Sequence, residues 1–141
     1  LYTERRARRG AHEVQRKLSL IGESAEPGAP GLLTLYPPPL EECSEEVRDW
    51  CADERPYAVL APGSAWETKQ WSAEGFRETG RALAARGLRI AVVGAPNELA
   101  QASRVCHEGD PRFTNWAGRT TLGEMLRLVE GAALVVCNDS M

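Results

Sequence analysis

From residue 57 onward, short apolar runs alternate with longer stretches in which apolar residues recur every three or four positions. The short runs are typical of buried strands, and the longer stretches are typical of helices with one buried face. The pattern predicts strands at residues 57–61, 88–93, 113–117 and 133–137, separated by helices at residues 72–86, 96–107 and 121–131. Regular strand–helix alternation indicates an α/β fold, with a Rossmann-like parallel sheet and flanking helices.

Signals at the helix ends support this segmentation. Ser72 stands where a cap is expected, Gly87 follows the first helix, and Pro96 suits the first turn of the second. Thr121 and Glu124 have the spacing of a capping box at the start of the third helix.

The first 56 residues have a less regular pattern. Residues 7–21 approximate the spacing of a helix that ends at Gly22, and the prolines and glycines that follow indicate a linker at residues 22–31. A short strand is predicted at residues 32–36, and Ser44 is expected to cap a helix through Asp53. We therefore expect a domain boundary at residues 22–31.

Composition and charge narrow the class of protein. The chain has 141 residues, 43% of them apolar, and a formal net charge of -3, which argues against nucleic acid as a main partner. Residues 1–21 are basic, and this segment either faces anionic lipid headgroups or is a solvated helix face. No apolar run approaches the roughly 18 residues that span a bilayer. The sequence shows no signal-peptide pattern, and its start at Leu1 suggests that the natural N-terminus lies upstream.

The cysteines form no metal-binding motif. Neither histidine has a ligand-like spacing to them, so we expect free thiols in a reducing compartment and no metal. These cysteines are Cys43, Cys51, Cys106 and Cys137. Cys137 lies in an apolar strand pattern, where a cysteine behaves as a small hydrophobe.

Polar and glycine residues follow three of the predicted strands. They are Pro62-Gly63-Ser64, Gly94 with Glu98 close behind, and Asn138-Asp139-Ser140. Parallel sheets bind ligands beyond the carboxyl ends of their strands, where helix N-termini present unpaired amides. We therefore expect a ligand site at this edge.

The loop that follows the first strand could hold a phosphate. Gly63 lets the backbone approach a ligand, Ser64 offers a hydroxyl, and Lys69 adds a charge. A lysine about 4 Å from a phosphate charge gains on the order of 4 kcal/mol at an effective dielectric near 20, before the cost of desolvation. The alternative is a solvent-exposed lysine in an ordinary turn, because the loop is neither G-x-G-x-x-G nor a Walker A motif.

The other candidates also have two interpretations. Glu98 either complements the dipole of its helix or accepts hydrogen bonds from a ribose diol. Residues 138–140 either cap a following helix or contact a ligand. Trp66, Trp71 and Trp116 are expected to pack against the core, with base stacking as the alternative.

Taken in order, three segments resemble the ADP-heptose:lipopolysaccharide heptosyltransferase family. In that family a proline-glycine loop leads to a K-x-W, a glycine-ended strand leads to an acidic residue, and G-x-T-x-L precedes an N-D-S strand end. The corresponding segments are "PGSAWETKQWSAEGF", "VVGAPNE" and "NWAGRTTLGEMLRLVEGAALVVCNDS". The resemblance covers residues 57–141 and is greater to the branch that adds the second core heptose than to the branch that adds the first. The family's histidine after N-D-S-x-x-x has no counterpart before the last residue, Met141.

The resemblance implies a two-domain GT-B architecture whose C-terminal domain holds the sugar nucleotide. It implies that Lys69 contacts the diphosphate of ADP-heptose and stabilises the leaving group, that Glu98 contacts the ribose, and that Asp139 lies at the phosphate and heptose region. Trp71 is expected to anchor the loop to the following helix. The implied donor-binding residues are Ser64, Lys69, Glu98, Asn138, Asp139 and Ser140. No metal or cofactor is expected.

These expectations combine into one hypothesis. The chain is predicted to be part of an inverting glycosyltransferase that moves heptose from ADP-heptose to the lipopolysaccharide inner core, a lipid A–Kdo or heptosyl acceptor. The expected location is the cytoplasmic face of the inner membrane of a Gram-negative-type bacterium, with peripheral membrane contact. The alternatives are a GT-B enzyme with another glycan or protein acceptor, or a non-catalytic nucleotide-binding module.

The predicted domain organisation has three parts. Residues 1–21 form the tail of an N-terminal acceptor domain, residues 22–56 a linker and entry segment, and residues 57–141 a truncated donor-binding domain. The general base is expected in the acceptor domain, so the chain alone is expected to be inactive.

Overall fold

The computed structural model describes residues 35–106 and 109–139. The chain divides into two compact units, residues 1–36 and 37–141, and the elements described below lie in the second. The predicted helix at residues 7–21 and the linker at residues 22–31 lie outside the described residues. Leu35 and Tyr36, at the end of the strand predicted at residues 32–36, are not in a strand.

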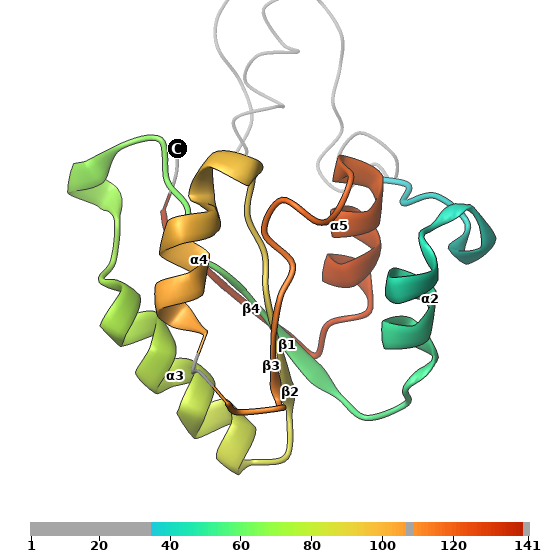
Figure 1. Cartoon of the computed structure of the whole chain (residues 1–141), viewed down its shortest axis with the longest axis horizontal. Helices are drawn as coiled ribbons and strands as arrows, with labels where there is room; N and C mark the ends of the chain where they lie inside the picture. Colours follow the sequence, from blue (N-terminus) through green and yellow to red (C-terminus); the bar gives the residue numbers. More distant parts are fainter. Residues whose placement is uncertain (1–34, 107–108, 140–141) are drawn as a thin grey trace, which may run out of the picture. The chain divides into compact units, whose positions relative to one another are not determined.

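The described residues form four parallel strands that alternate with helices, as the apolar pattern predicts (Figure 1). The strands are β1 (Tyr57–Ala61), β2 (Arg89–Val92), β3 (Phe113–Asn115) and β4 (Leu134–Cys137). The α-helices are α2 (Glu45–Ala52), α3 (Ala73–Ala85), α4 (Leu99–Val105) and α5 (Leu122–Glu130). Short 3-10 helices are η1 (Leu40–Glu42), η2 (Glu67–Lys69) and η3 (Pro96–Glu98).

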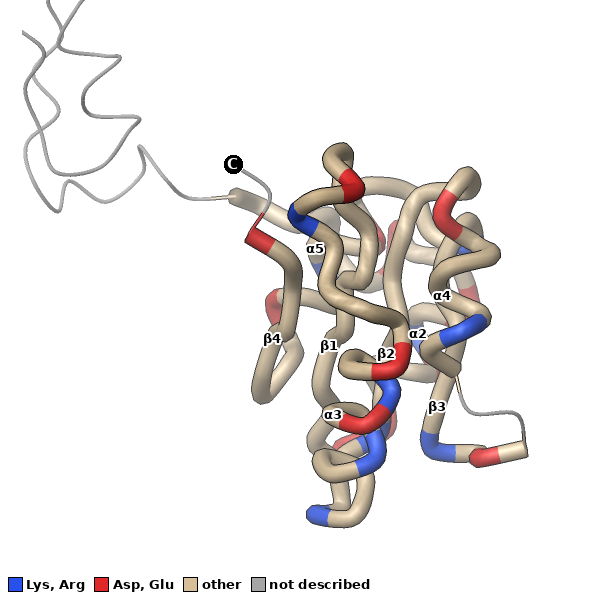
Figure 2. The backbone as a smooth tube through the Cα atoms, turned by 90° about the vertical axis from the view of Figure 1, so that its left-hand side faces the viewer, with Lys and Arg blue, Asp and Glu red and all other residues tan. Residues whose placement is uncertain are grey.

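The sheet has the strand order β3-β2-β1-β4, with helices on both faces. Helices α3 and α4 cover one face, and α2 and α5 cover the other (Figure 1). Side chains alternate between the faces, so Leu60 of β1 packs in the cluster that contains Phe76 of α3. Its neighbour Val59 packs in the cluster that contains Val47 and Leu128 on the opposite face. Strands β1 and β4 carry no charged residue (Figure 2), as expected for the apolar runs.

Two predicted elements are shorter or more irregular than the pattern indicated. The helix predicted at residues 96–107 consists of η3 followed by α4, because Glu98 has φ -98° and ψ 2° and interrupts the α-helical geometry. The strand predicted at residues 113–117 ends at Asn115, because the Asn115 side chain accepts the Ala117 N–H at 3.0 Å. The Trp116 N–H still donates to Val92 O, at 2.7 Å.

The edge strand β4 is more exposed than its sequence suggested. Leu134 and Val135 are 44% and 41% exposed. Cys137, expected to behave as a small hydrophobe, is also exposed. The physical reason is that, among the described residues, β4 pairs with β1 alone.

A buried arginine fixes the segment that leads into the sheet. Arg89, at the start of β2, donates hydrogen bonds to the carbonyls of Trp50, Asp53 and Arg55. Its guanidinium also stacks on the Trp50 ring, 4.0 Å from the centroid. The segment between α2 and β1 is therefore held to the amino end of the sheet, and residues 37–56 pack into the same compact unit as the sheet.

A buried carboxylate joins α2 to α5. Glu124 accepts hydrogen bonds from the Thr121 N–H at 2.8 Å and hydroxyl at 3.0 Å, so the predicted capping box is confirmed. It also accepts the Ser44 N–H at 2.7 Å. Ser44 occupies the N-cap of α2 as predicted, but its hydroxyl makes no capping bond. The donated bonds from Thr121 and Ser44 lower the pKa of Glu124 to about 2.

Candidate functional site

The strand order places a topological switch at β1. The chain passes from β1 to β2 and β3 on one side and then returns to β4 on the other side. Crevices for ligands form at such switches, beyond the carboxyl ends of the strands. Residues 62–64, called here the 62–64 turn, follow β1, and Asn138 and Asp139 follow β4. The structure therefore brings these two predicted segments to one edge of the sheet.

Asn138 joins the two segments through a buried side chain. Only 7% of it is exposed. Its Nδ2 donates to Pro62 O at 2.7 Å and Gly63 O at 3.2 Å, and its Oδ1 accepts the Trp71 N–H at 2.8 Å. The whole amide is thus engaged with the backbone of the chain. Asp139 is exposed, and Ser140 lies outside the described residues.

Glu98 lies against the 62–64 turn. A Cβ on Gly63 would lie 1.9 Å from Glu98 Oε1, so a larger residue here would require the carboxylate to move. The other oxygen, Oε2, accepts the Ala95 N–H at 2.7 Å. Glu98 therefore stabilises the start of its own helical segment, one of the two roles that the sequence left open, and it also stands beside the turn.

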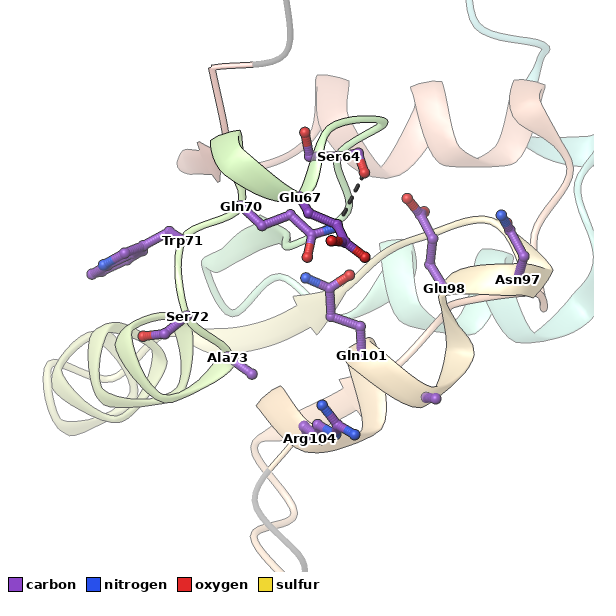
Figure 3. Close-up of a pocket in the computed structure, with 11 residues that line it drawn as sticks. Ser64, Glu67, Gln70, Trp71, Ser72, Ala73, Asn97, Glu98, Gln101 and Arg104 are labelled. Carbon is purple, nitrogen blue, oxygen red and sulfur yellow. Dashed lines mark hydrogen bonds between the residues drawn. The ribbon is translucent and has the colours of Figure 1, made fainter.

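Ser64 and Glu98 border the same cavity, of about 510 Å³. The cavity lies between the loop that contains η2 and the helical segment η3–α4 (Figure 3). Its walls also carry Glu67, Gln70, Gln101 and Arg104. Figure 3 shows the side chains of Gln70 and Gln101 pointing into this space from opposite walls. The lining is polar and of mixed charge, which suits a ligand with both anionic groups and hydroxyls.

Lys69 ends η2 and is exposed. It immediately precedes Gln70 but is not among the residues that line the cavity. The Ser64 hydroxyl makes local contacts, accepting the Trp66 N–H at 3.3 Å and donating to Trp66 O at 3.2 Å. The predicted residues therefore gather at one edge, with Ser64 and Glu98 in the cavity wall, Asn138 beneath the turn and Lys69 on the loop.

The tryptophans differ from the expected packing. Trp116 is buried, as predicted, but Trp66 is 64% exposed and Trp71 is 48% exposed. Trp66 precedes η2 on a loop whose residues 65–70 are all exposed. Trp71 packs on the first turn of α3, where its ring centroid is 5.1 Å from that of Phe76. The prediction that Trp71 anchors the loop to the following helix is therefore confirmed.

Comparison with models of protein families identifies the family of the chain. The model of glycosyltransferase family 9 (heptosyltransferase) matches residues 2–141 of the chain. The chain belongs to this family. The resemblance read from the three segments of residues 57–141 is thus confirmed, and the family match extends beyond these residues.

Solved structures agree with the fold of this family 9 chain. Escherichia coli heptosyltransferase WaaC with ADP is 32% identical over 62% of the chain, with a TM-score of 0.55. WaaC with ADP-2-deoxy-2-fluoro heptose is similar over 99% of the chain, with a TM-score of 0.64 and 22% identity. Escherichia coli ADP-heptose lps heptosyltransferase II is similar over 69% of the chain, with a TM-score of 0.60 and 22% identity. No curated protein matched the chain in a sequence search.

The family 9 chain spans a minority of each related structure. It covers 27% and 43% of the two WaaC chains and 33% of heptosyltransferase II. Within the residues that the structure describes, no helix is long and apolar enough to cross a membrane. The same residues contain no group of three or more histidine, cysteine or acidic side chains placed to hold a metal ion.

The sequence analysis of this family 9 chain missed the polar residues of α4. Gln101 donates to Pro62 O at 2.7 Å, and Arg104 lines the cavity. With Asn97 they are spaced by four and then three positions, which places all three on one side of the helical segment. The spacing of these polar residues was a signal present in the sequence, and the buried residues of α4, Ala102 and Val105, lie on the adjacent side of the helix.

Proposed function

We propose that the chain is the donor-binding part of an inverting glycosyltransferase that transfers heptose from ADP-heptose to the lipopolysaccharide inner core. The acceptor is lipid A–Kdo or its heptosylated form, and the reaction takes place in the cytoplasm at the inner face of the inner membrane. The acceptor, the location and the peripheral membrane contact extend the resemblance beyond family membership. The donor is supported by the names of related structures, which contain ADP and an ADP-heptose analogue.

One structural observation carries the proposal. The 62–64 turn, Glu98 and Asn138 come from three different strand ends and meet at the switch point of a parallel sheet. The backbone of such a turn suits phosphate, and a carboxylate nearby suits the hydroxyls of a ribose. A sugar nucleotide has both groups, and the adjoining cavity of about 510 Å³ has the size of a small-molecule pocket.

The proposed chemistry is a direct displacement at the anomeric carbon of heptose. The acceptor oxygen forms a bond to this carbon while the bond to the ADP oxygen breaks, so the configuration inverts. The acceptor proton passes to a general base, which the resemblance assigns to the acceptor-binding domain. Lys69 offsets the charge that develops on departing ADP, as a preformed positive charge stabilises the transition state.

The remaining site residues have binding roles in this proposal. Glu98 accepts hydrogen bonds from the ribose, Asp139 and Ser140 lie near the phosphate and heptose, and Ser64 belongs to the phosphate-side turn. No metal or cofactor is part of the proposed reaction, since the lysine and the backbone amides supply the positive potential.

Calorimetric titration of the full-length protein with ADP and ADP-heptose tests the donor site. Lys69→Ala and Glu98→Gln are each expected to weaken ADP binding by about tenfold or more, which corresponds to about 1.4 kcal/mol. Glu98→Gln retains an oxygen that can accept the Ala95 N–H, so it tests the carboxylate rather than the helix start. Arg81→Ala and Glu78→Gln, on the exposed side of α3, serve as matched charge controls.

A transfer assay tests the activity itself. Mass spectrometry of lipid A–Kdo acceptors, incubated with enzyme and ADP-heptose, should detect the added heptose. Absence of ADP binding by the wild-type protein would refute the donor site. Binding without transfer to any inner-core acceptor would instead favour another acceptor or a non-catalytic module.

A further inference from the structure

Side-chain amides hold three consecutive carbonyls of the 62–64 turn. Gln101 Nε2 and Asn138 Nδ2 both donate to Pro62 O, each at 2.7 Å. Asn138 Nδ2 also donates to Gly63 O at 3.2 Å, and Gln70 Nε2 donates to Ser64 O at 3.1 Å. The three amides come from α4, from the end of β4 and from the loop after η2. Three different parts of the fold therefore together set the directions of these carbonyls.

Fixing a carbonyl also fixes the amide that follows it. A trans peptide unit is planar, and its N–H points away from its C=O. The described peptide bonds include no cis bond. When the carbonyls of residues 62–64 are directed at the three side-chain amides, the N–H groups of residues 63–65 are turned away from those amides. Each of these N–H donors is thus held in a fixed direction.

Asn138 is the central member of this arrangement. It is the only one of the three that contacts two turn carbonyls among the described hydrogen bonds, and it also accepts the Trp71 N–H. An asparagine is required for this combination, because one end must donate and the other must accept. Aspartate has the same shape but would direct an oxygen at two carbonyl oxygens. With its amide engaged and only 7% of the side chain exposed, Asn138 has little capacity left for a ligand.

We infer that Asn138 is a positioning residue, supported by Gln101, that orients the N–H groups of the 62–64 turn toward the diphosphate of the donor. This inference rests on the proposed function, because it assigns a role at the same nucleotide site. It also changes the role expected for Asn138 from a direct donor contact to a support of the residues that make the contact. A preorganised turn binds an anion without first ordering its own backbone.

Comparing the binding of ADP with that of adenosine distinguishes the loss of a positioned turn from a general loss of structure. In the full-length protein, Asn138→Asp and Asn138→Leu are expected to weaken ADP binding, measured by calorimetry, by about tenfold or more. Adenosine binding, measured by NMR titration, is expected to change by less than about twofold, because adenosine lacks the diphosphate. Gln101→Ala, on the surface of α4, should produce the same selectivity with a smaller loss of about threefold. This variant keeps the test decisive if the Asn138 variants do not fold.

Asn115→Leu is the matched control. Asn115 also ends a parallel strand, and its side chain contacts Ser103 and the Ala117 N–H, away from the turn. We expect it to alter stability and leave the affinity for ADP unchanged. The inference is overturned if folded Asn138 and Gln101 variants bind ADP like the wild type, or if they lose ADP and adenosine equally. Either of those results would leave the proposed function intact. A wild-type protein that binds no ADP would refute both the proposed function and the inference.

Discussion

Replacement of Glu124 by glutamine tests the junction between α2 and α5. The carboxylate accepts the N–H groups of Ser44 and Thr121 and the Thr121 hydroxyl, at 2.7, 2.8 and 3.0 Å. Glu124→Gln keeps the size of the side chain but replaces one acceptor oxygen by an NH₂ group. In either orientation the NH₂ group faces a backbone N–H, that of Ser44 or that of Thr121, and it cannot accept this hydrogen bond because both groups are donors.

The magnitude follows from the pKa of Glu124. Lowering this pKa from 4.5 to about 2 corresponds to about 3 kcal/mol in the free energy of unfolding. The folded pKa lies below the unfolded value, so this stabilisation is complete above pH 4.5 and is lost as the pH falls toward 2. About 2 kcal/mol of it should be gone by pH 3.

Urea unfolding of the wild-type and Glu124→Gln chains at pH 7 and pH 3 measures both effects. At pH 7 the variant should be less stable by about 3 kcal/mol, and the difference should shrink to about 1 kcal/mol at pH 3. Glu46→Gln is the matched control, because Glu46 lies on α2 and forms an exposed ion pair with Arg119. An exposed pair contributes about 0–1 kcal/mol. Equal stability of variant and wild type at pH 7, or a difference that is the same at both pH values, would refute the reasoning.

Three further substitutions or reactions test other parts of the structure. Gly80→Ala should lower the free energy of unfolding by about 1–2 kcal/mol in urea titrations, because overpacking costs more than helix propensity returns; its Cβ would lie 2.8 Å from the Phe113 ring. Arg89→Met should cost about 3 kcal/mol or more by the same measurement, since the carbonyls of Trp50, Asp53 and Arg55 lose a charged donor. A loss below about 1 kcal/mol would contradict this role. Iodoacetamide labelling at pH 8, followed by peptide mass spectrometry, should modify the exposed Cys137 well before Cys106. The reason is that burial raises the pKa of the Cys106 thiol to about 11. Faster labelling of Cys106 would show that the C-terminal end of α4 opens.

Local sequence signals predicted the elements of the sheet, but not the contacts between distant residues. Ser72 and Thr121 cap their helices with side-chain hydrogen bonds, as expected from neighbours three positions away. Ser44 does not, and its backbone N–H instead donates to a carboxylate 80 positions along the chain, which the local sequence could not indicate. Arg89 is similar, since the carbonyls that justify its burial lie 34 to 39 positions earlier. These contacts depend on the tertiary structure, which the local sequence does not determine.

The location of the candidate site was likewise predictable from the sequence, whereas the contacts within it were not. The rule that parallel sheets bind ligands at their carboxyl edge located the 62–64 turn, Glu98 and Asn138 correctly relative to the strands. It could not indicate that the Glu98 carboxylate lies against Gly63, or that the Asn138 amide is occupied by backbone groups. Those facts depend on positions of side chains to within an ångström, which spacing along the chain does not determine. The roles of Lys69, Asp139 and Ser140 stay predictions from the family resemblance.

The bonds from Asn138 to the 62–64 turn also impose an order of assembly. Asn138 is 76 positions from Pro62, so the turn lacks this support until β4 has been synthesised and has paired with β1. Contacts of such long sequence separation slow folding, because the entropy of closing the loop is lost before the contact stabilises the chain. On a ribosome, a nascent chain that already contains the whole turn would still lack a finished nucleotide site. A nucleotide bound at this turn would therefore stabilise only chains in which β4 is already paired with β1.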